Sequence, residues 1–350
     1  MIEIIGAGPV GCTAAIEGLE AGERVDIYEI KKEVGEPSHC SGLLSRDGME
    51  GLRKYINWKE HVLNRIDGAI ISFGGKEIFV GREGVAYVVD RKGWDKALAQ
   101  KAVDNGAKLH LGKRADHFRG NVIIGADGAF STVARRFGFP DIKRFVRTAK
   151  GYCRWPDESI VRVYIDSRWV GLFGWVIPQG DGTAEFGIGT FGEPISSFSL
   201  FTRSIGMSAK VERMNVIPMQ LREITSMEVN GRQVLLAGNA AGQVKQTTGG
   251  GVIIGMSCGA IAGKTRNSDA YEKEWRASYL KDLLLHRYIM ALVRRMDNRR
   301  LYDFGVMLKA LEIDTLLSKY GEMERVSKAI NRNTIVQLSR LAFNAIPLLI

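Results

Sequence analysis

The glycine-rich turn Gly6-Ala7-Gly8-Pro9-Val10-Gly11, near the start of the chain, constrains the fold most strongly. It follows an apolar segment at residues 2–5 that predicts a strand, and it opens a segment of small and apolar residues that predicts a helix ending at Gly22. A second apolar segment at residues 25–28 predicts another strand. A strand, a glycine turn, a helix and a strand in this order indicate a βαβ unit.

The turn has the spacing G-x-G-x-x-G, which is typical of dinucleotide binding in this context. Gly6 permits the tight turn, Gly8 lets a pyrophosphate approach the backbone, and Gly11 allows the helix to pack against the strand. The N-terminus of the helix then faces the phosphates. Glu29 ends the second strand 18 residues after Gly11, where a carboxylate accepts hydrogen bonds from ribose hydroxyls and disfavours a 2′-phosphate. The sequence therefore predicts that FAD or NAD binds at the turn, and that Val10 of the turn is among the residues that contact it.

The rest of the chain divides into segments of different periodicity. Short alternating runs at residues 69–90 and 150–231 predict antiparallel strands, and the chain from residue 268 onward predicts helices. Tyr271, Trp275, Tyr279 and Leu283 recur every four residues, as do Leu284, Tyr288, Leu292 and Met296, which indicates a face packed into the core.

These segments predict an α/β (α+β) fold with three parts. We expect a Rossmann-like, discontinuous dinucleotide-binding domain at residues 1–68, 88–130 and 231–265. An antiparallel substrate-binding domain is expected at residues 69–87 and 131–230, and a helical region at residues 266–350.

Composition excludes several classes of protein. The four cysteines (Cys12, Cys40, Cys153 and Cys258) are far apart, which argues against a metal site or a disulfide framework and fits a reducing cytosol. No apolar run reaches the length of a spanning helix. The net charge is +10, and residues 264–350 hold 16 Lys and Arg against 10 Asp and Glu, a net of +6. Such charge suits nucleic acid, an anionic lipid or a phosphorylated ligand, or serves solubility alone.

Two later segments resemble the further FAD fingerprints of the p-hydroxybenzoate hydroxylase superfamily. They are VIIGADGAFSTVARR at residues 122–136 and VLLAGNAAGQVKQTTGGGVIIG at residues 234–255. The resemblance implies FAD rather than NAD. It also implies contacts to the cofactor from Asp127, from Asn239 where the superfamily usually has Asp, and from the helix start at Gly250, Gly251 and Val252. By the same resemblance, Arg91 lies on the cofactor and a strand residue, Ala115, lies beside the adenine.

Two motifs resemble the geranylgeranyl reductase family within that superfamily. The loop Pro37-Ser38-His39-Cys40-Ser41-Gly42 matches the P-x-x-C-x-G pattern of the family. The segment at residues 173–189 matches Y-x-W-x-F-P followed by G-x-G, with Phe173 in place of Tyr and Ile177 in place of Phe. The resemblance extends over about residues 1–300.

The resemblance implies a FAD-dependent reductase that saturates C=C bonds of geranylgeranyl chains in archaeal-type glycerolipids. Cys40 and Ser41 then lie at the flavin, Cys40 acts beside the substrate, and Phe173, Trp175 and Ile177 line an apolar tunnel. NADPH or a ferredoxin-like carrier supplies electrons. We expect peripheral contact with the cytoplasmic face of the membrane, with shallow insertion of residues 341–350, and no nucleic-acid partner.

Two alternatives stay open at this point. A flavin-dependent monooxygenase or halogenase of the same fold is one, because FGWVIP also approximates the W-x-W-x-I-P of halogenases. A lipid-surface binding protein with structural FAD is the other, and Asn239 favours it. Acid–base roles are also open, since His39 and Cys40 are neighbours but no Ser/His/Asp set or paired carboxylate accompanies them.

Overall fold

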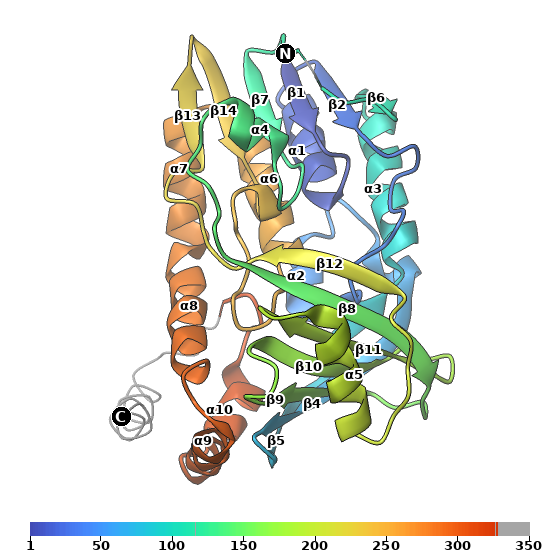
Figure 1. The fold of residues 1–350 in the computed structure, drawn as a ribbon. Helices are drawn as coiled ribbons and strands as arrows, with labels where there is room; N and C mark the ends of the chain where they lie inside the picture. The colour runs from blue at the N-terminus through green and yellow to red at the C-terminus, as the bar shows by residue number, and fades with distance from the viewer. Residues whose placement is uncertain (116, 326, 328–350) are drawn as a thin grey trace.

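The computed structural model describes residues 1–115, 117–325 and 327, which fold into two β-sheets and their covering helices (Figure 1). Among these residues the first sheet has the order β13-β14-β7-β1-β2-β6. The second has the order β12-β8-β11-β10-β9-β4-β5-β3. The predicted α/β (α+β) fold class is confirmed.

The first sheet is built around the opening strand, with β1 paired in parallel to β2 on one side and to β7 on the other. Its strands are β1 (Ile2–Ile5), β2 (Val25–Glu29), β6 (Lys108–Leu111), β7 (Val122–Gly125), β13 (Ser226–Val229) and β14 (Arg232–Leu236). Both faces of the sheet are covered, which explains why Ile4 and Ile5, on opposite sides of β1, are both apolar and buried. Ile4 packs in a cluster with side chains of α1 (Pro9–Glu20), α3 (Arg91–Asp104) and α6 (Val252–Thr265). Ile5 packs on the opposite side with α4 (Thr132–Arg136).

The second sheet is largely antiparallel, although β4 and β9 pair in parallel. Its strands are β3 (Leu43–Ser45), β4 (Val62–Phe73), β5 (Lys76–Val89), β8 (Phe145–Arg154), β9 (Ile160–Ile165), β10 (Gly171–Pro178), β11 (Thr183–Thr190) and β12 (Arg213–Pro218). Helix α5 (Pro194–Ser204) covers one face, where Val176 and Phe186 pack against Phe198 and Phe201. The opposite face is turned toward the cavity described below.

A column of helices runs along both sheets at the left of Figure 1. It consists of α7 (Ser268–Trp275), a π-helical turn η3 (Arg276–Leu280) and α8 (Lys281–Val293). Below it, α9 (Asn298–Ala310) and α10 (Ile313–Tyr320) contact β5. The short elements α2 (Arg46–Gly51), η1 (Trp58–His61) and η2 (Gly238–Ala240) lie in the connections.

The first predicted helical stripe is confirmed as core, and the second is wrong in part. Tyr271, Trp275, Tyr279 and Leu283 are all buried. Tyr288, however, is 67% exposed, and the buried positions of α8 continue instead through His286 and Met290. The π-helical turn adds a residue to one turn of the helix and so rotates the buried face of everything that follows.

The predicted domain boundaries stay a prediction, but some strands cross them. Residues 43–45 and 62–68, assigned to the dinucleotide-binding domain, hydrogen-bond within the second sheet. Residues 226–229, assigned to the substrate-binding domain, pair with β14 of the first sheet. The predicted boundary at residue 68 falls inside β4, because β4 is one continuous strand of 12 residues from Val62 to Phe73. Residues 328–350 of the predicted helical region lie outside the described residues.

No helix in the described part of the chain is both long enough and apolar enough to cross a bilayer. Residues 341–350, predicted to insert at an interface, are not among the described residues.

The turn at the start of α1 generates a prediction about stability. A Cβ on Gly11 would lie 1.9 Å from the carbonyl oxygen of Gly6, whereas a Cβ on Gly8 would meet no atom within 4 Å. Gly11→Ala should therefore lower the free energy of unfolding by about 1–3 kcal/mol, the usual cost of overpacking, while Gly8→Ala should cost about 1 kcal/mol or less. Chemical denaturation of both variants measures this, and equal stability of the two would contradict it.

Candidate functional site

A cavity of about 1090 Å³ lies between the glycine turn, the loop at residues 35–43, the open face of the second sheet and the C-terminal helices. At one end its wall contains the backbone of the turn and several charged side chains. At the other end it is formed mainly by aliphatic and aromatic side chains. Such a cavity can hold a ligand with one polar part and one long apolar part.

The glycine turn forms the polar end. Gly6 adopts φ +103°, a left-handed conformation that favours glycine, and Gly8 and Val10 line the cavity. The carboxylate of Glu29 accepts hydrogen bonds from the backbone N–H groups of Ala7 and Lys31, both at 2.9 Å. Glu29 thus lies at the carboxyl end of β2, beside the turn, as the sequence predicted.

Arg91 lies in the same part of the cavity wall and is buried. Its Nε and Nη2 donate to Oδ1 of Asp95 at 3.2 and 2.9 Å. Its Nη1 has no hydrogen-bond partner among the described residues. A buried guanidinium nitrogen without a partner in a cavity wall is a position where a ligand oxygen is expected.

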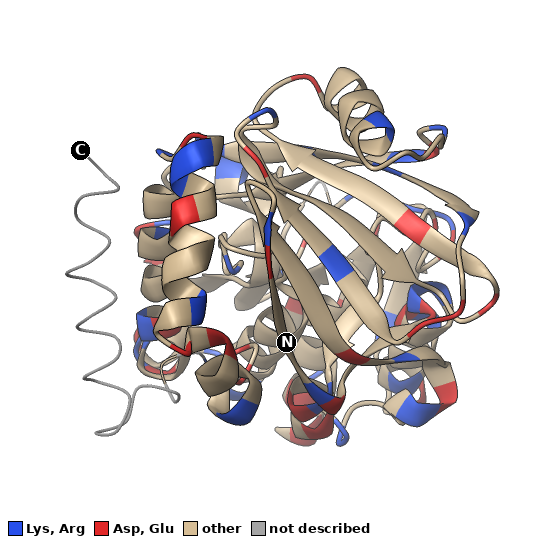
Figure 2. Cartoon of the chain, turned by 90° about the horizontal axis from the view of Figure 1, so that it is seen from below, with Lys and Arg blue, Asp and Glu red and all other residues tan. Residues whose placement is uncertain are grey.

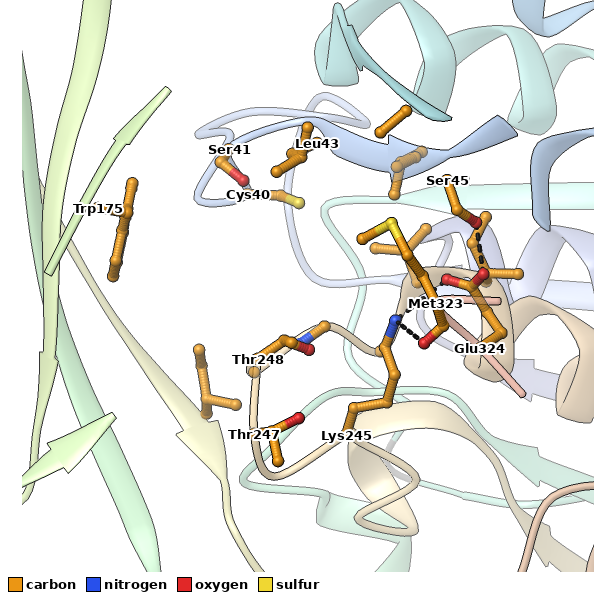
Figure 3. Close-up of a pocket in the computed structure, with 18 of the residues that line it drawn as sticks. Cys40, Ser41, Leu43, Ser45, Trp175, Lys245, Thr247, Thr248, Met323 and Glu324 are labelled. Carbon is orange, nitrogen blue, oxygen red and sulfur yellow. Dashed lines mark hydrogen bonds and ion pairs between the residues drawn. The ribbon is translucent and has the colours of Figure 1, made fainter. Parts of the chain in front are cut away.

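The loop at residues 35–43 contributes to the cavity wall and contains neither helix nor strand until Leu43 begins β3. Cys40 and Ser41 line the cavity, and Figure 3 shows their loop across an open space from Trp175. The N–H of Gly42 lies 3.5 Å from Sγ of Cys40. His39 also lines the cavity, and burial lowers the pKa of its imidazole below the ordinary value.

Phe173, Trp175 and Ile177 alternate along β10 and all line the cavity. The residues between them face the other way, since Val176 packs with α5 and a Cβ on Gly174 would lie 2.5 Å from Phe201. This alternation is the period-2 geometry of a strand.

The neighbouring strand explains the glycine that follows the Trp motif. Gly187 of β11 pairs directly with Trp175, and a Cβ at this position would lie 2.0 Å from the indole. The indole therefore occupies the space that the missing side chain leaves.

The helix start at Gly250, Gly251 and Val252 also lines the cavity, together with Asn239. Gly251 is the N-cap of α6, so the unpaired N–H groups and positive dipole end of this helix lie at the cavity wall.

Four residues of the predicted cofactor site do not line the cavity. Gly6 and Gly11 shape the turn beneath it. Asp127 lies between two lining residues, and its Oδ2 accepts from the N–H of Thr132 at 2.6 Å, so it fixes the start of α4. Ala115 was predicted in a strand, but β6 ends at Leu111 and Ala115 lies in the loop that follows, packed near Phe118.

Sequence reasoning missed a second group of polar residues in the wall. Lys245 donates to Oε1 of Glu324 and to the carbonyl of Met323, both at 3.1 Å, and Ser45 donates to Oε2 of Glu324. Figure 3 shows this network opposite Trp175. The partners are up to 279 residues apart, and no local motif marks them.

His286 was also missed. It lines the cavity from α8, and its Nδ1 lies 2.6 Å from Oγ1 of Thr247. Burial, and secondarily the charge of Lys245, lowers the pKa of His286 to about 4. The imidazole is therefore neutral at pH 7.

The described residues contain no cluster of three or more His, Cys, Asp or Glu side chains that could hold a metal ion. Their four cysteines are free thiols.

Comparison with known proteins identifies relatives of this chain. No protein-family model matches the chain. The digeranylgeranylglycerophospholipid reductase 2 of Methanopyrus kandleri is 28% identical over 96% of this chain and 92% of its own length. The digeranylgeranylglycerophospholipid reductase of Methanosarcina mazei is 28% identical over 80% of this chain and 81% of its own. The resemblance to reductases of geranylgeranyl chains is thereby confirmed.

Solved structures share the fold. A geranylgeranyl bacteriochlorophyll reductase-like protein of Thermoplasma acidophilum has a TM-score of 0.80, with 19% identity over 99% of this chain and 98% of that one. The flavin-dependent halogenase CmlS has a TM-score of 0.61, with 16% identity over 98% of this chain and 70% of that one.

The buried imidazole predicts a pH dependence of stability. The ordinary pKa of histidine is 6.5, and that of folded His286 is about 4, so between these values the unfolded chain binds a proton that the folded chain does not. The free energy of unfolding should fall by up to about 3 kcal/mol as the pH drops from 6.5 to 4.

His286→Gln should remove this contribution, so the pH profile of the variant becomes shallower over the same window. Urea denaturation at several pH values measures the two profiles. Identical slopes for the variant and the parent chain would show that His286 is not the titrating group.

Proposed function

We propose that this chain is a FAD-dependent reductase that saturates C=C bonds of geranylgeranyl chains in archaeal-type isoprenoid glycerolipids. One observation carries the proposal: a single continuous cavity joins a dinucleotide-binding turn, the Cys40 loop and an apolar wall that includes Trp175. Relatives over most of the chain are named as reductases of such lipids, which supports the same conclusion.

The residues present fit FAD. The space above Gly8 is open, so a pyrophosphate can approach the backbone, and the carboxylate of Glu29 is placed for a ribose. Arg91 offers an unpaired Nη1 in the wall, and Asn239 and the N-terminus of α6 lie farther along it. We infer that these groups hold the adenine and ribityl portions and the flavin ring.

A reduced flavin, when bound, supplies a hydride to one carbon of an alkene. The residues of the chain have three further tasks: to hold the alkene in place, to keep water away and to bring a proton to the second carbon. An isolated alkene offers no polar group for orientation, so its position must come from packing. Phe173, Trp175 and Ile177 on one side and Leu285, Ile289, Leu292, Phe304 and Leu308 on the other supply an apolar wall for the chain.

Cys40 is the residue that we assign to the reacting end. Its loop lines the same cavity as the glycine turn and the apolar residues of β10, so a group that lies between them can contact Cys40. The electron donor that we propose is NADPH or a ferredoxin-like carrier.

Other flavoprotein chemistries use the same fold, as the halogenase CmlS and the monooxygenase PqsL illustrate. They match at 16% identity, which reflects shared architecture rather than shared chemistry. The reductase reading is favoured over both alternatives because the relatives named as reductases match in sequence along most of the chain.

We also propose that the enzyme contacts the membrane peripherally, because a prenylated lipid leaves a bilayer at a cost of about 0.8 kcal/mol for each CH₂. Lys and Arg are interspersed with Asp and Glu along the ribbon in Figure 2, and the net charge of +10 would attract the chain to an anionic surface.

The function is tested by anaerobic turnover. The purified protein should carry about one FAD per chain and, once reduced, should saturate geranylgeranyl glycerolipid without oxygen, as measured by mass spectrometry of the product. Cys40→Ala and Trp175→Ala should keep FAD but lower turnover by about 10²-fold, the cost of misplacing reacting groups by ~1 Å.

Equal loss of flavin and turnover in Trp175→Ala would mark this residue as structural. Strict dependence on oxygen would identify a monooxygenase or halogenase, and bound FAD with no turnover at all would identify a binding protein.

Membrane contact predicts sedimentation with anionic liposomes that weakens between low and high salt, since each well-placed Lys or Arg contributes about 1 kcal/mol at low ionic strength. Deletion of residues 341–350 should remove the part of the binding that resists salt. Absence of liposome binding by the intact chain would exclude this mode of lipid access.

A further inference from the structure

Glu185 is a fully buried carboxylate of β11 that no step of the proposed reaction uses. Three donors surround it. Lys150 Nζ and the Tyr152 hydroxyl donate to Oε2 at 2.8 and 2.9 Å, and the indole Nε1 of Trp175 donates to Oε1 at 2.9 Å. The carboxylate therefore fixes the edge of the Trp175 indole in the cavity wall.

Lys150 continues this network toward the other side of the cavity. It comes from β8, is 4% exposed and lines the cavity. Besides Glu185, its Nζ donates to the backbone carbonyl of Cys40 at 3.1 Å. A continuous chain of hydrogen bonds thus runs from the indole of Trp175 through Glu185 and Lys150 to the peptide of Cys40.

The residues at the two ends are those assigned above to the apolar wall and to the reacting end. Figure 3 shows them on opposite sides of an open space. Trp175 is held by a strand, but Cys40 lies in a loop without regular structure, so its position depends on individual contacts such as the one from Lys150.

A buried ion pair is a poor device for stability alone. The cost of removing both charges from water is often as large as their attraction, and apolar residues of similar shape are frequently as stable. What the pair does provide is a strong tether, because charge-assisted hydrogen bonds are roughly twice as strong as neutral ones.

We propose that Glu185 and Lys150 are positioning residues that set the gap between Trp175 and the Cys40 loop and thereby select which double bond of the isoprenoid chain comes to rest beside Cys40. The selection of a double bond rests on the proposed function. The hydrogen-bonded link from Trp175 through Glu185 and Lys150 to Cys40 does not.

The link is tested without substrate by the alkylation rate of Cys40. Three proteins are treated with iodoacetamide: the parent chain, Lys150→Met and the double variant Lys150→Met/Glu185→Gln. The alkylation of each cysteine over time is measured by peptide mass spectrometry. Loss of a charge-assisted hydrogen bond should raise the rate at Cys40 by about tenfold or more through local opening of the loop. Tyr152→Phe, which removes a donor to the same carboxylate but leaves the chain of contacts intact, should change it less than about twofold.

Cys12 and Cys258 serve as internal references because both are fully buried and distant in the chain from the loop. Their rates should not change. The double variant is the decisive one, since it removes both charges together, whereas Lys150→Met alone leaves a buried carboxylate without its cation.

The other end of the link is read by nuclear magnetic resonance. The indole N–H signal of Trp175, assigned with Trp175→Phe, should move upfield in the double variant because an amide is a weaker acceptor than a carboxylate. It should stay in place in Tyr152→Phe.

Turnover supplies the last readout. The double variant should keep its FAD content and melting temperature but change the order in which the double bonds are reduced, with a lower kcat at similar KM. Unchanged Cys40 alkylation and an unchanged Trp175 signal in the double variant would overturn the proposed link. A wild-type product pattern, in spite of a loosened loop, would overturn its role in selection. Absence of any alkene reduction by the parent chain would refute the proposed function and with it the selection role, while the alkylation and resonance results would still decide the link.

Discussion

The structure depends on keeping a cavity open between the second sheet on one side and the Cys40 loop and C-terminal helices on the other, whose apolar side chains would otherwise pack together. Packing favours collapse of such a space, because each void forfeits contacts on its lining. Two buried ion pairs oppose this. Lys150 with Glu185 holds the Cys40 loop from the second sheet, and Lys245 with Glu324 holds the segment after α10 against Ser45. Separating either pair would leave a buried charge without its partner, so each pair holds the segments that it joins in a fixed position.

The same arrangement explains how a common flavoprotein architecture can serve a lipid. The fold as a whole is similar to that of solved structures named as a halogenase and a monooxygenase. In this chain the cavity has an apolar wall that comes from β10 and from helices α8, α9 and α10. Chemistry therefore depends on the second sheet and the C-terminal helices more than on the fold as a class.

The parts of the site that sequence could predict are those set by local geometry. The turn from Gly6 to Gly11 follows from spacing within one βαβ unit, and Phe173, Trp175 and Ile177 follow from the alternation of a strand. Lys245, His286 and Glu324 escaped prediction because their contacts join segments far apart in the chain. The strand expected at Ala115 was wrong because β6 ends at Leu111, where Gly112 turns the chain with φ +65°.

The π-helical turn at Arg276–Leu280 sets the phase of the helix that follows. Upstream of it, Tyr271 and Trp275 face the first sheet, and downstream of it, His286 and Met290 face inward. One residue corresponds to about 100° of rotation in a helix. A relative that lacked the extra residue would turn the whole of α8 by that angle, so that His286 left the cavity wall while the core around Trp275 stayed intact. An insertion or deletion at this turn would therefore change which side chains of α8 line the apolar end of the cavity, without any substitution within α8.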